Sequence, residues 1–215
     1  MRYRTVLIDL DGTLVDAFTT IHRSYAHTLP QFGYPAPTIE EVRAAVGGGL
    51  DQAIARFVPL ELVPRVRAVH IEYSQKILLE DVVLLPGGRA LLERLNARGV
   101  TCAVFTNKHA PSARRICDHL GVAPLLRGVF GAGDTPWLKP QPEFAHHVLA
   151  ALAAVPATTC LIGDSPFDVA AARNAAIDFA GVTTGTHSAA ELYAAGADVV
   201  VTDLVKLSQT WGLGD

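Results

Sequence analysis

One stretch decides the fold of this chain: Val6-Leu7-Ile8-Asp9-Leu10-Asp11-Gly12-Thr13-Leu14-Val15-Asp16. Its apolar residues run directly into carboxylates, a glycine and a threonine, which is typical of a strand buried on both faces of a parallel sheet and followed by a turn. Asp9 would lie at the carboxyl end of that strand and Asp11 on the turn. Open α/β sheets bind their ligands at this edge. Because buried like charges repel unless a cation or a shared proton relieves them, the two acids predict a functional site.

The composition excludes several classes of protein. At 215 residues, 50% hydrophobic and 18% charged, the chain is expected to be globular and able to bury a sizeable core. A net charge of -3 gives no reason to propose a nucleic acid or an anionic membrane as partner. We see neither a signal peptide nor a membrane span. The cysteines Cys102, Cys117 and Cys160 are odd in number and lie in apolar surroundings, which predicts reduced core thiols and a cytoplasmic location.

The residues from Ala17 to about Asp81 interrupt the strand pattern. They show only helical periodicity, broken by glycines and prolines. Thr38 and Glu41 have the spacing of a capping box, and the helix that it starts is predicted to end at the glycines 47–49. We therefore predict a helical insert at residues 17–81, within a core formed by residues 1–16 and 82–215.

Helix and strand patterns alternate after this insert. The predicted strands are residues 100–105, 129–130, 158–162, 178–182 and 198–202, and the predicted helices are residues 90–98, 111–120, 142–154, 165–176 and 189–195. Such alternation indicates a parallel sheet with right-handed crossovers. The predicted fold class is α/β, a doubly wound, Rossmann-like parallel sheet with a helical domain inserted after the first strand.

Polar residues follow two more of the predicted strands, and one polar segment precedes a helix. These segments are Thr106-Asn107-Lys108, Gly163-Asp164-Ser165-Pro166-Phe167-Asp168 and Lys139-Pro140-Gln141-Pro142. In a doubly wound sheet they converge on one edge. Asp164 and Asp168 are one helical turn apart, so they can face the same way.

This set of side chains suits phosphoryl transfer. Several oxygen ligands around one point suit Mg²⁺, which uses one or two carboxylates, waters and a substrate phosphate. Lys139 would add a positive charge for an anionic substrate, and Thr106 a hydroxyl donor. An aspartate can attack phosphorus and form an aspartyl-phosphate, while a second acid protonates the leaving oxygen and later activates water.

At this point the residues resemble a known family. Four segments resemble the four motifs of the haloacid dehalogenase superfamily and occur in the same order. They are Asp9-x-Asp11-Gly12-Thr13-Leu14-x-Asp16, Thr106-Asn107, Lys139-Pro140 and Gly163-Asp164-x-x-x-Asp168. The predicted insert resembles the helical cap of the phosphoglycolate phosphatase-like branch. The resemblance implies that Asp9 is the nucleophile, that Asp11 is the general acid and base, and that Thr106 and Lys139 hold the phosphoryl group.

The same resemblance implies a Mg²⁺ ion. Its ligands would be Asp9, the backbone carbonyl of Asp11 and Asp164, with Asp168 either as a further ligand or behind the ligands. The candidate substrate-binding residues are Gly12, Thr13, Asn107, Arg43 and Gly48.

Some of these residues allow a plainer interpretation. Asn107 and Ser165 more often orient a loop through backbone hydrogen bonds than touch a substrate. Glycines 47–49 are either a flexible link between helices or a loop that closes over the site, in which case Arg43 could contact a substrate carboxylate or phosphate. Lys108 and His109 are expected to face solvent.

Three positions bear on the choice of reaction. The family usually has a glycine where Ala175-Ala176-Ile177 stands, which leaves the turn geometry there in doubt. The phosphomutase branch carries a histidine at the position of Ile21. Asp11 argues against dehalogenation, because a carbon–halogen bond has no leaving oxygen to protonate.

The predicted function is a Mg²⁺-dependent phosphatase that hydrolyses a small phosphorylated metabolite, with phosphoglycolate as a candidate, through an aspartyl-phosphate. The alternatives are a sugar phosphomutase, a hydrolase of pyrophosphate or a nucleotide, and a non-catalytic binding module on the same fold. The sequence does not indicate an oligomeric state.

Overall fold

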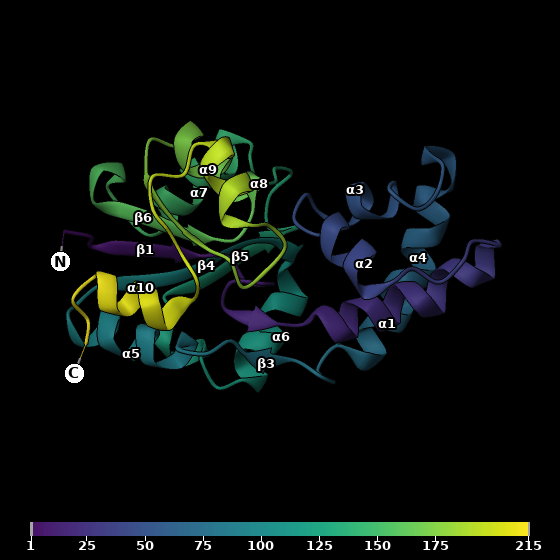
Figure 1. Ribbon diagram of the computed structural model, residues 1–215, viewed down its shortest axis with the longest axis horizontal. Helices are drawn as coiled ribbons and strands as arrows, with labels where there is room; N and C mark the ends of the chain where they lie inside the picture. The colour runs from purple at the N-terminus through teal and green to yellow at the C-terminus, as the bar shows by residue number, and fades with distance from the viewer. Residues whose placement is uncertain (1, 215) are drawn as a thin grey trace.

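The computed structural model describes residues 2–214, and it places a sheet flanked by helices next to a group of helices with no sheet of its own (Figure 1). Within these residues, six parallel strands form the sheet, in the order β5-β4-β1-β6-β7-β8. Their bounds are β1 Thr5–Ile8, β4 Thr101–His109, β5 Gly128–Ala132, β6 Thr159–Gly163, β7 Asp178–Val182 and β8 Val200–Val201. The predicted α/β, doubly wound parallel sheet is confirmed.

The first strand lies at the point where the order of the strands reverses. After β1 the chain builds β4 and β5 on one side, and then returns to build β6, β7 and β8 on the other side. All four residues of β1 are buried, as a continuous apolar run predicts. Ligands of doubly wound sheets bind at such a reversal, beyond the carboxyl ends of the strands. Asp9 lies at this position, directly after β1.

Helices cover both faces of this sheet. The helices are α5 Gly88–Ala97, α6 Ala110–His119, α7 Pro142–Ala151, α8 Pro166–Asn174, α9 Ala189–Ala195 and α10 Leu204–Thr210. Val6 and Ile8 of β1 pack with residues of α5, α6 and α10, whereas Leu7 packs with residues of α7 and α8. The alternation of side chains along a strand therefore divides the core into two layers.

The helical group lies between β1 and α5 in the sequence. Its helices are α1 Phe18–Thr28, α2 Ile39–Ala45, α3 Leu50–Ile54 and α4 Val63–Ile77, with short 3₁₀ helices at Leu29–Phe32 and Leu60–Leu62. They pack around a core of their own that includes Tyr25, Ile54 and Val66. The capping box of Thr38 and Glu41 forms as expected at the start of α2. All four helices fall inside residues 17–81, and we call this group the insert.

Two short strands join the insert to the sheet portion. The strands β2 Val15–Asp16 and β3 Val83–Leu84 pair antiparallel, so the entry and the exit of the insert are held together. The sequence analysis did not predict them, because two-residue strands carry no alternation pattern. The final helix α10 was also not predicted.

Most other elements match the predicted ranges within a few residues. The main difference is β4, which continues to His109 through the polar residues 106–109, with an irregular register against β5 after Phe105. The turn after α8 forms without a glycine, because Ala176 adopts a left-handed conformation with φ 52°. Such a conformation costs an alanine about 1–2 kcal/mol.

The three cysteines are free and buried, as predicted. Burial raises the pKa of each thiol to about 12, so none is a nucleophile at neutral pH. Across residues 2–214, every helix is too short or too polar to cross a bilayer.

Candidate active site

The site is built around Asp9, the first residue after β1. Its backbone N–H donates to the carbonyl of Ile162 at 2.9 Å, which extends the pairing of β1 with β6 by one residue. The residue is 7% exposed and lines a cavity. Its side chain is therefore mostly buried but borders the cavity.

Lys139 is the cation of this cluster. Its Nζ lies 2.8 Å from Asp9 Oδ1 and 2.6 Å from Asp168 Oδ1, and it donates to the carbonyl of Phe105 at 3.1 Å. The residue is 3% exposed. Burial alone would lower the pKa of Lys139, but the carboxylates of Asp168 and Asp9 outweigh burial and raise it. The ammonium is therefore charged at every working pH.

Asp168 holds Lys139 in place. While Oδ1 pairs with Lys139, Oδ2 accepts hydrogen bonds from the backbone N–H and the hydroxyl of Ser165, at 3.1 and 2.6 Å. Burial raises the pKa of Asp168, and Lys139 opposes that rise. Asp168 thus links the Lys139 ammonium to Ser165, and this ion pair favours the interpretation of Asp168 as support behind the ligands.

Asp164 is oriented by two threonines. Its Oδ1 accepts a hydrogen bond from Thr13 Oγ1 at 2.9 Å, and its Oδ2 accepts from the backbone N–H and the hydroxyl of Thr186 at 2.8 and 2.9 Å. Burial, followed by the charges of Asp9 and Asp168, raises the pKa of Asp164 to about 7. The carboxylates of this site therefore repel one another.

This repulsion fits a divalent cation. Oxygens of Asp9, Asp164 and Asp168 lie within 4.8 Å of one another, and all three residues are buried. Together with Asp11, the cluster has four carboxylates against the two ammonium groups of Lys139 and Lys108. A hard dication with oxygen ligands would balance the remaining charge. The donor set is therefore suited to Mg²⁺.

Asp11 is paired with Lys108. Nζ of Lys108 donates to both carboxylate oxygens at 3.0 and 2.9 Å, and its side chain is 14% exposed. The expectation that Lys108 faces solvent is wrong, because β4 continues through residues 106–109 and turns this side chain toward Asp11. The same expectation holds for His109, which is exposed.

Asn107 joins the site to the insert. Its side-chain amide donates to the carbonyls of Gly47 at 2.9 Å and Lys139 at 3.0 Å, and its Oδ1 accepts from the N–H of Lys139 at 2.8 Å. All of these contacts are to backbone groups. The arrangement favours the interpretation of Asn107 as a residue that orients two loops.

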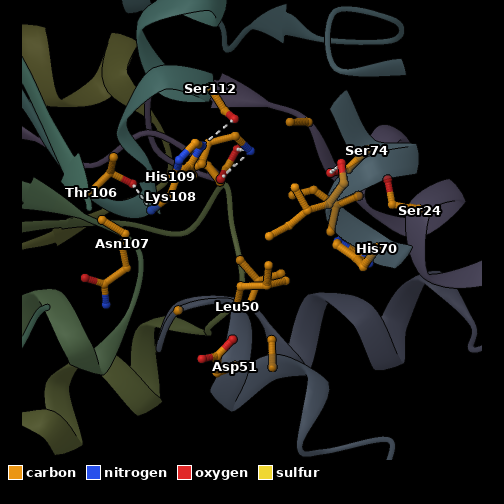
Figure 2. Close-up of a pocket in the computed structure, with 18 of the residues that line it drawn as sticks. Ser24, Leu50, Asp51, His70, Ser74, Thr106, Asn107, Lys108, His109 and Ser112 are labelled. Carbon is orange, nitrogen blue, oxygen red and sulfur yellow. Dashed lines mark hydrogen bonds and ion pairs between the residues drawn. The ribbon is translucent and has the colours of Figure 1, made fainter. Parts of the chain in front are cut away.

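A cavity of about 660 Å³ separates the site from the insert. Figure 2 shows Thr106, Asn107, Lys108 and His109 on one side of it, with His70, Ser74 and Ser24 of the insert on the other. Thr106 is 2% exposed, and its hydroxyl accepts a hydrogen bond from the N–H of Lys108 at 3.2 Å.

The predicted substrate-binding residues occupy different places. Gly48 and Asn107 line the cavity. Thr13 supports Asp164, and Gly12, with φ 84°, packs so closely that a Cβ there would lie 2.8 Å from the Cα of Gly185. These two residues shape the side of the site around Asp164, which their motif alone did not reveal.

Arg43 lies outside the cavity lining, at the contact between α2 and the sheet portion. Its guanidinium donates to the carbonyl of Gly185 at 3.5 Å, lies 4.0 Å from Asp16 and stacks over the ring of Phe18 at 4.0 Å. This position favours a role in seating the insert. Asp16 itself accepts a hydrogen bond from the N–H of Phe18, so it also orders the start of α1.

The comparisons with known proteins agree with this geometry. Residues 6–182 match the family model described as haloacid dehalogenase-like hydrolase. The chain belongs to this family. A protein named probable phosphatase IndB, from Dickeya dadantii, is 30% identical over 202 residues, which cover 91% of this chain and 88% of that protein. A phosphoglycolate phosphatase from Pseudomonas savastanoi is 31% identical over 215 residues, which cover 95% of this chain and 78% of that protein.

Solved structures of the family share the fold. A crystal structure of a predicted phosphoglycolate phosphatase from Haemophilus somnus has a TM-score of 0.90 at 22% identity, covering 98% of this chain and 99% of that one. The resemblance to the family's phosphoglycolate phosphatase-like branch, and the prediction of a phosphatase-type hydrolase, are confirmed.

The sequence analysis missed two threonines of the candidate active site. Thr186 follows β7 and donates twice to Asp164, and Thr184, beside it, donates to the carbonyl of Gly12 at 2.7 Å. Their signal was present, because residues 183–186 lie directly beyond the carboxyl end of a predicted strand. Lys108, the charged partner of Asp11, likewise lies just beyond the carboxyl end of a predicted strand, residues 100–105.

Proposed function

We propose that this chain hydrolyses a phosphate monoester of a small metabolite through an aspartyl-phosphate on Asp9, with Mg²⁺ bound. The observation that carries the proposal is the buried cluster of Asp9, Lys139, Asp164 and Asp168, of which Asp9 lines the cavity. Because several relatives are named phosphoglycolate phosphatases, phosphoglycolate is the reference ester.

In the first step, a carboxylate oxygen of Asp9 attacks phosphorus and the bond from phosphorus to the ester oxygen breaks. Asp11 gives its proton to that leaving oxygen, so the product leaves as an alcohol. Lys139 and Thr106 lie at the same sheet edge, where they can donate to the oxygens of the transferring group.

In the second step, Asp11 takes a proton from water, and that water attacks the phosphorus of the aspartyl-phosphate. The bond between phosphorus and Asp9 breaks and inorganic phosphate is released. Asp9, the backbone carbonyl of Asp11 and Asp164 would hold Mg²⁺. When bound, this ion neutralises charge on the phosphoryl oxygens.

The alternatives have less support in the structure. Ile21 lines the cavity at the position where the phosphomutase branch carries a histidine, and it has no group that could move a proton. A non-catalytic binding module would have no need for a buried cluster of mutually repelling carboxylates, whose assembly costs stability.

The test is phosphate release with and without Mg²⁺ from phosphoglycolate, pyrophosphate, sugar phosphates and nucleotides. We expect Mg²⁺-dependent release that is lost in Asp9→Asn and kept in Lys76→Met. Lys76 makes a matched control because its pair with Glu72 is exposed and outside the cavity. A folded protein that releases phosphate neither from these esters nor from benzyl phosphate would contradict the proposed function.

A further inference from the structure

The insert side of the cavity differs in chemistry from the catalytic side. Among the lining residues from the insert, most large side chains are apolar, namely Ile21, Tyr25, Val46, Leu50, Ile71 and Leu78. A phosphate ester seated on Asp9 would direct its leaving group toward this surface, because Asp9 and the insert residues line the same cavity. The chemistry of this surface, which we call the insert wall, therefore indicates the chemistry of the leaving group.

The volume of the cavity indicates a leaving group larger than glycolate. Pockets of about 300–1,000 Å³ hold drug-sized ligands. The cavity of about 660 Å³ falls inside that range. Glycolate is a two-carbon acid and would leave most of the apolar wall without a partner, which forfeits the hydrophobic and dispersion contacts that the wall offers.

The charges of the lining disfavour an acidic leaving group. Its only lysine and arginine are Lys108 and Arg67, and each is already paired with a carboxylate. Lys108 donates to Asp11, and Nε of Arg67 lies 2.9 Å from Asp51. A carboxylate on the substrate would have to compete with Asp51 or with the catalytic Asp11 for a cation.

One polar atom of the insert wall has no partner. Nδ1 of His70 is buried and accepts or donates no hydrogen bond within residues 2–214, and His70 is 5% exposed. Its ring packs against that of Tyr25 at 4.5 Å. Burial lowers the pKa of His70 to about 4, so the ring is neutral at working pH. An unpaired buried polar atom destabilises the folded protein unless a ligand supplies its hydrogen bond.

Three further polar groups of this wall are already engaged. Oγ of Ser24 donates to the carbonyl of Thr20 at 3.0 Å, Oγ of Ser74 donates to the carbonyl of Ile71 at 3.1 Å, and Nε2 of Gln75 donates to Ser112 at 2.7 Å. Among the described residues of the insert, Nδ1 of His70 is the one buried side-chain nitrogen or oxygen without a hydrogen-bond partner.

We infer that the leaving group is an uncharged, mainly apolar alcohol larger than glycolate, with one hydrogen-bonding group that reaches His70. The inference rests on the proposed function, since it assumes that the phosphate is seated on Asp9. It separates this chain from enzymes that select small acidic esters, because the cavity lacks an uncommitted cation for a second negative charge.

Three esters of equal size test the inference: benzyl phosphate, 4-carbamoylbenzyl phosphate and 4-carboxybenzyl phosphate. We expect kcat/KM to be highest for the carbamoyl ester and at least about tenfold lower for the carboxylate ester, with phosphoglycolate no better than the carboxylate. Equal or faster turnover of either acidic ester would overturn the inference while the phosphatase function stands.

His70 is tested by two variants. His70→Phe should remove the preference for the carbamoyl ester over benzyl phosphate, and His70→Asn, whose amide can take the place of Nδ1, should restore part of it. The readout is this ratio of kcat/KM values, which a general loss of structure would not change selectively. An unchanged ratio in His70→Phe would overturn the role of His70.

Asp51→Asn provides a test in the opposite direction. It leaves Arg67 without its carboxylate, so we expect the carboxylate ester to gain about fivefold to tenfold relative to the carbamoyl ester. No gain would contradict the argument from paired cations.

Binding separates failure of the inference from failure of the proposed function. The phosphonate analogues of the three esters cannot be hydrolysed, and calorimetry with Mg²⁺ should rank them in the same order. Ranked binding without turnover of the esters would exclude the proposed function but support the inferred leaving group. Absence of binding by all three would overturn the inference.

Discussion

The two walls of the cavity are stabilised in different ways. On the sheet side, charged groups are buried and paired within 3.0 Å, as in the contacts of Lys139 and Lys108 with three carboxylates. On the insert side most large side chains are apolar, and within residues 2–214 the one buried polar side-chain atom of the insert without a partner belongs to a neutral His70. The sheet wall therefore fixes the chemistry, whereas the insert wall can select a leaving group without disturbing the charges.

The difference also sets what a substitution costs. Removing one partner from a buried ion pair leaves an uncompensated charge, which is expensive. Removing an unpaired polar atom from an apolar wall removes a cost that the folded protein already carries. Substitutions on the two walls should therefore change the free energy of unfolding by different amounts, and in some cases in opposite directions.

The largest expected effect is on catalysis. Asp11→Asn removes the proposed general acid, so kcat/KM on alkyl esters, which reports the first step, should fall by about 10²–10⁴-fold. The fall in kcat/KM should be much smaller on 4-nitrophenyl phosphate, because its leaving oxygen needs no proton. Phosphate release at low concentrations of each ester measures the difference. An equal fall in kcat/KM on both esters would contradict the role of Asp11 as general acid.

The next effect is on stability. Lys139→Met leaves the carboxylates of Asp9 and Asp168 without their cation, so the free energy of unfolding should fall by about 3–5 kcal/mol. Urea denaturation of the Mg²⁺-free protein measures it. Lys76→Met is the matched control, since loss of its exposed pair with Glu72 should change the free energy of unfolding little. A small effect at Lys139 would mean that the carboxylates are neutralised by protons rather than by the lysine.

A third prediction concerns pH and metal. The pKa of Asp164 rises from 3.8 to about 7, so between these values the folded, Mg²⁺-free protein holds a proton that the unfolded chain has released. The contribution of Asp164 to stability therefore decreases as pH rises through this window. Because Mg²⁺ replaces the proton, the stabilisation by Mg²⁺ should grow with pH, to about 3 kcal/mol at a hundredfold excess over its Kd.

Thermal unfolding with Mg²⁺ and with a chelator, from pH 5 to pH 8, measures this difference. His70 titrates in both curves and cancels when they are subtracted. A stabilisation that stays constant over this range would contradict a raised pKa at Asp164.

The smallest prediction is on the insert wall. His70→Phe should raise the free energy of unfolding by about 1 kcal/mol at pH 7.5, because it removes the unpaired Nδ1. The pKa of His70 is lowered from 6.5 to about 4, so the unfolded chain binds a proton that the folded protein excludes, and stability falls as pH decreases through this window. The variant lacks this proton, so its advantage should widen toward pH 5. Destabilisation at both pH values would mean that His70 has a partner.

The sheet wall could be predicted from the sequence because its residues follow strands that the apolar runs already identify. Asp9, Thr106 and Asp164 each come directly after such a run, and the edge rule brings them together. Lys108 was misjudged because strand β4 continues through a polar segment, whose composition is typical of a loop.

The insert wall could not be predicted in the same way. His70 lies in an apolar helical stripe, where a histidine normally has a partner, and only the packing of α4 against α1 shows that Nδ1 has none. Arg43 was assigned to substrate because it precedes the glycines, but tertiary packing places it against Asp16 and Phe18. Such contacts join distant residues and leave no local pattern.

The amide of Asn107 has a thermodynamic consequence. One NH₂ group donates to the carbonyl of Lys139 and to that of Gly47 in the insert. The backbone at Lys139 and the loop of the insert are therefore held by one amide group, and their positions are coupled. By reciprocity, a substrate that tightens the backbone around Lys139 would also favour this position of the insert loop, and that position would strengthen substrate binding by the same free energy.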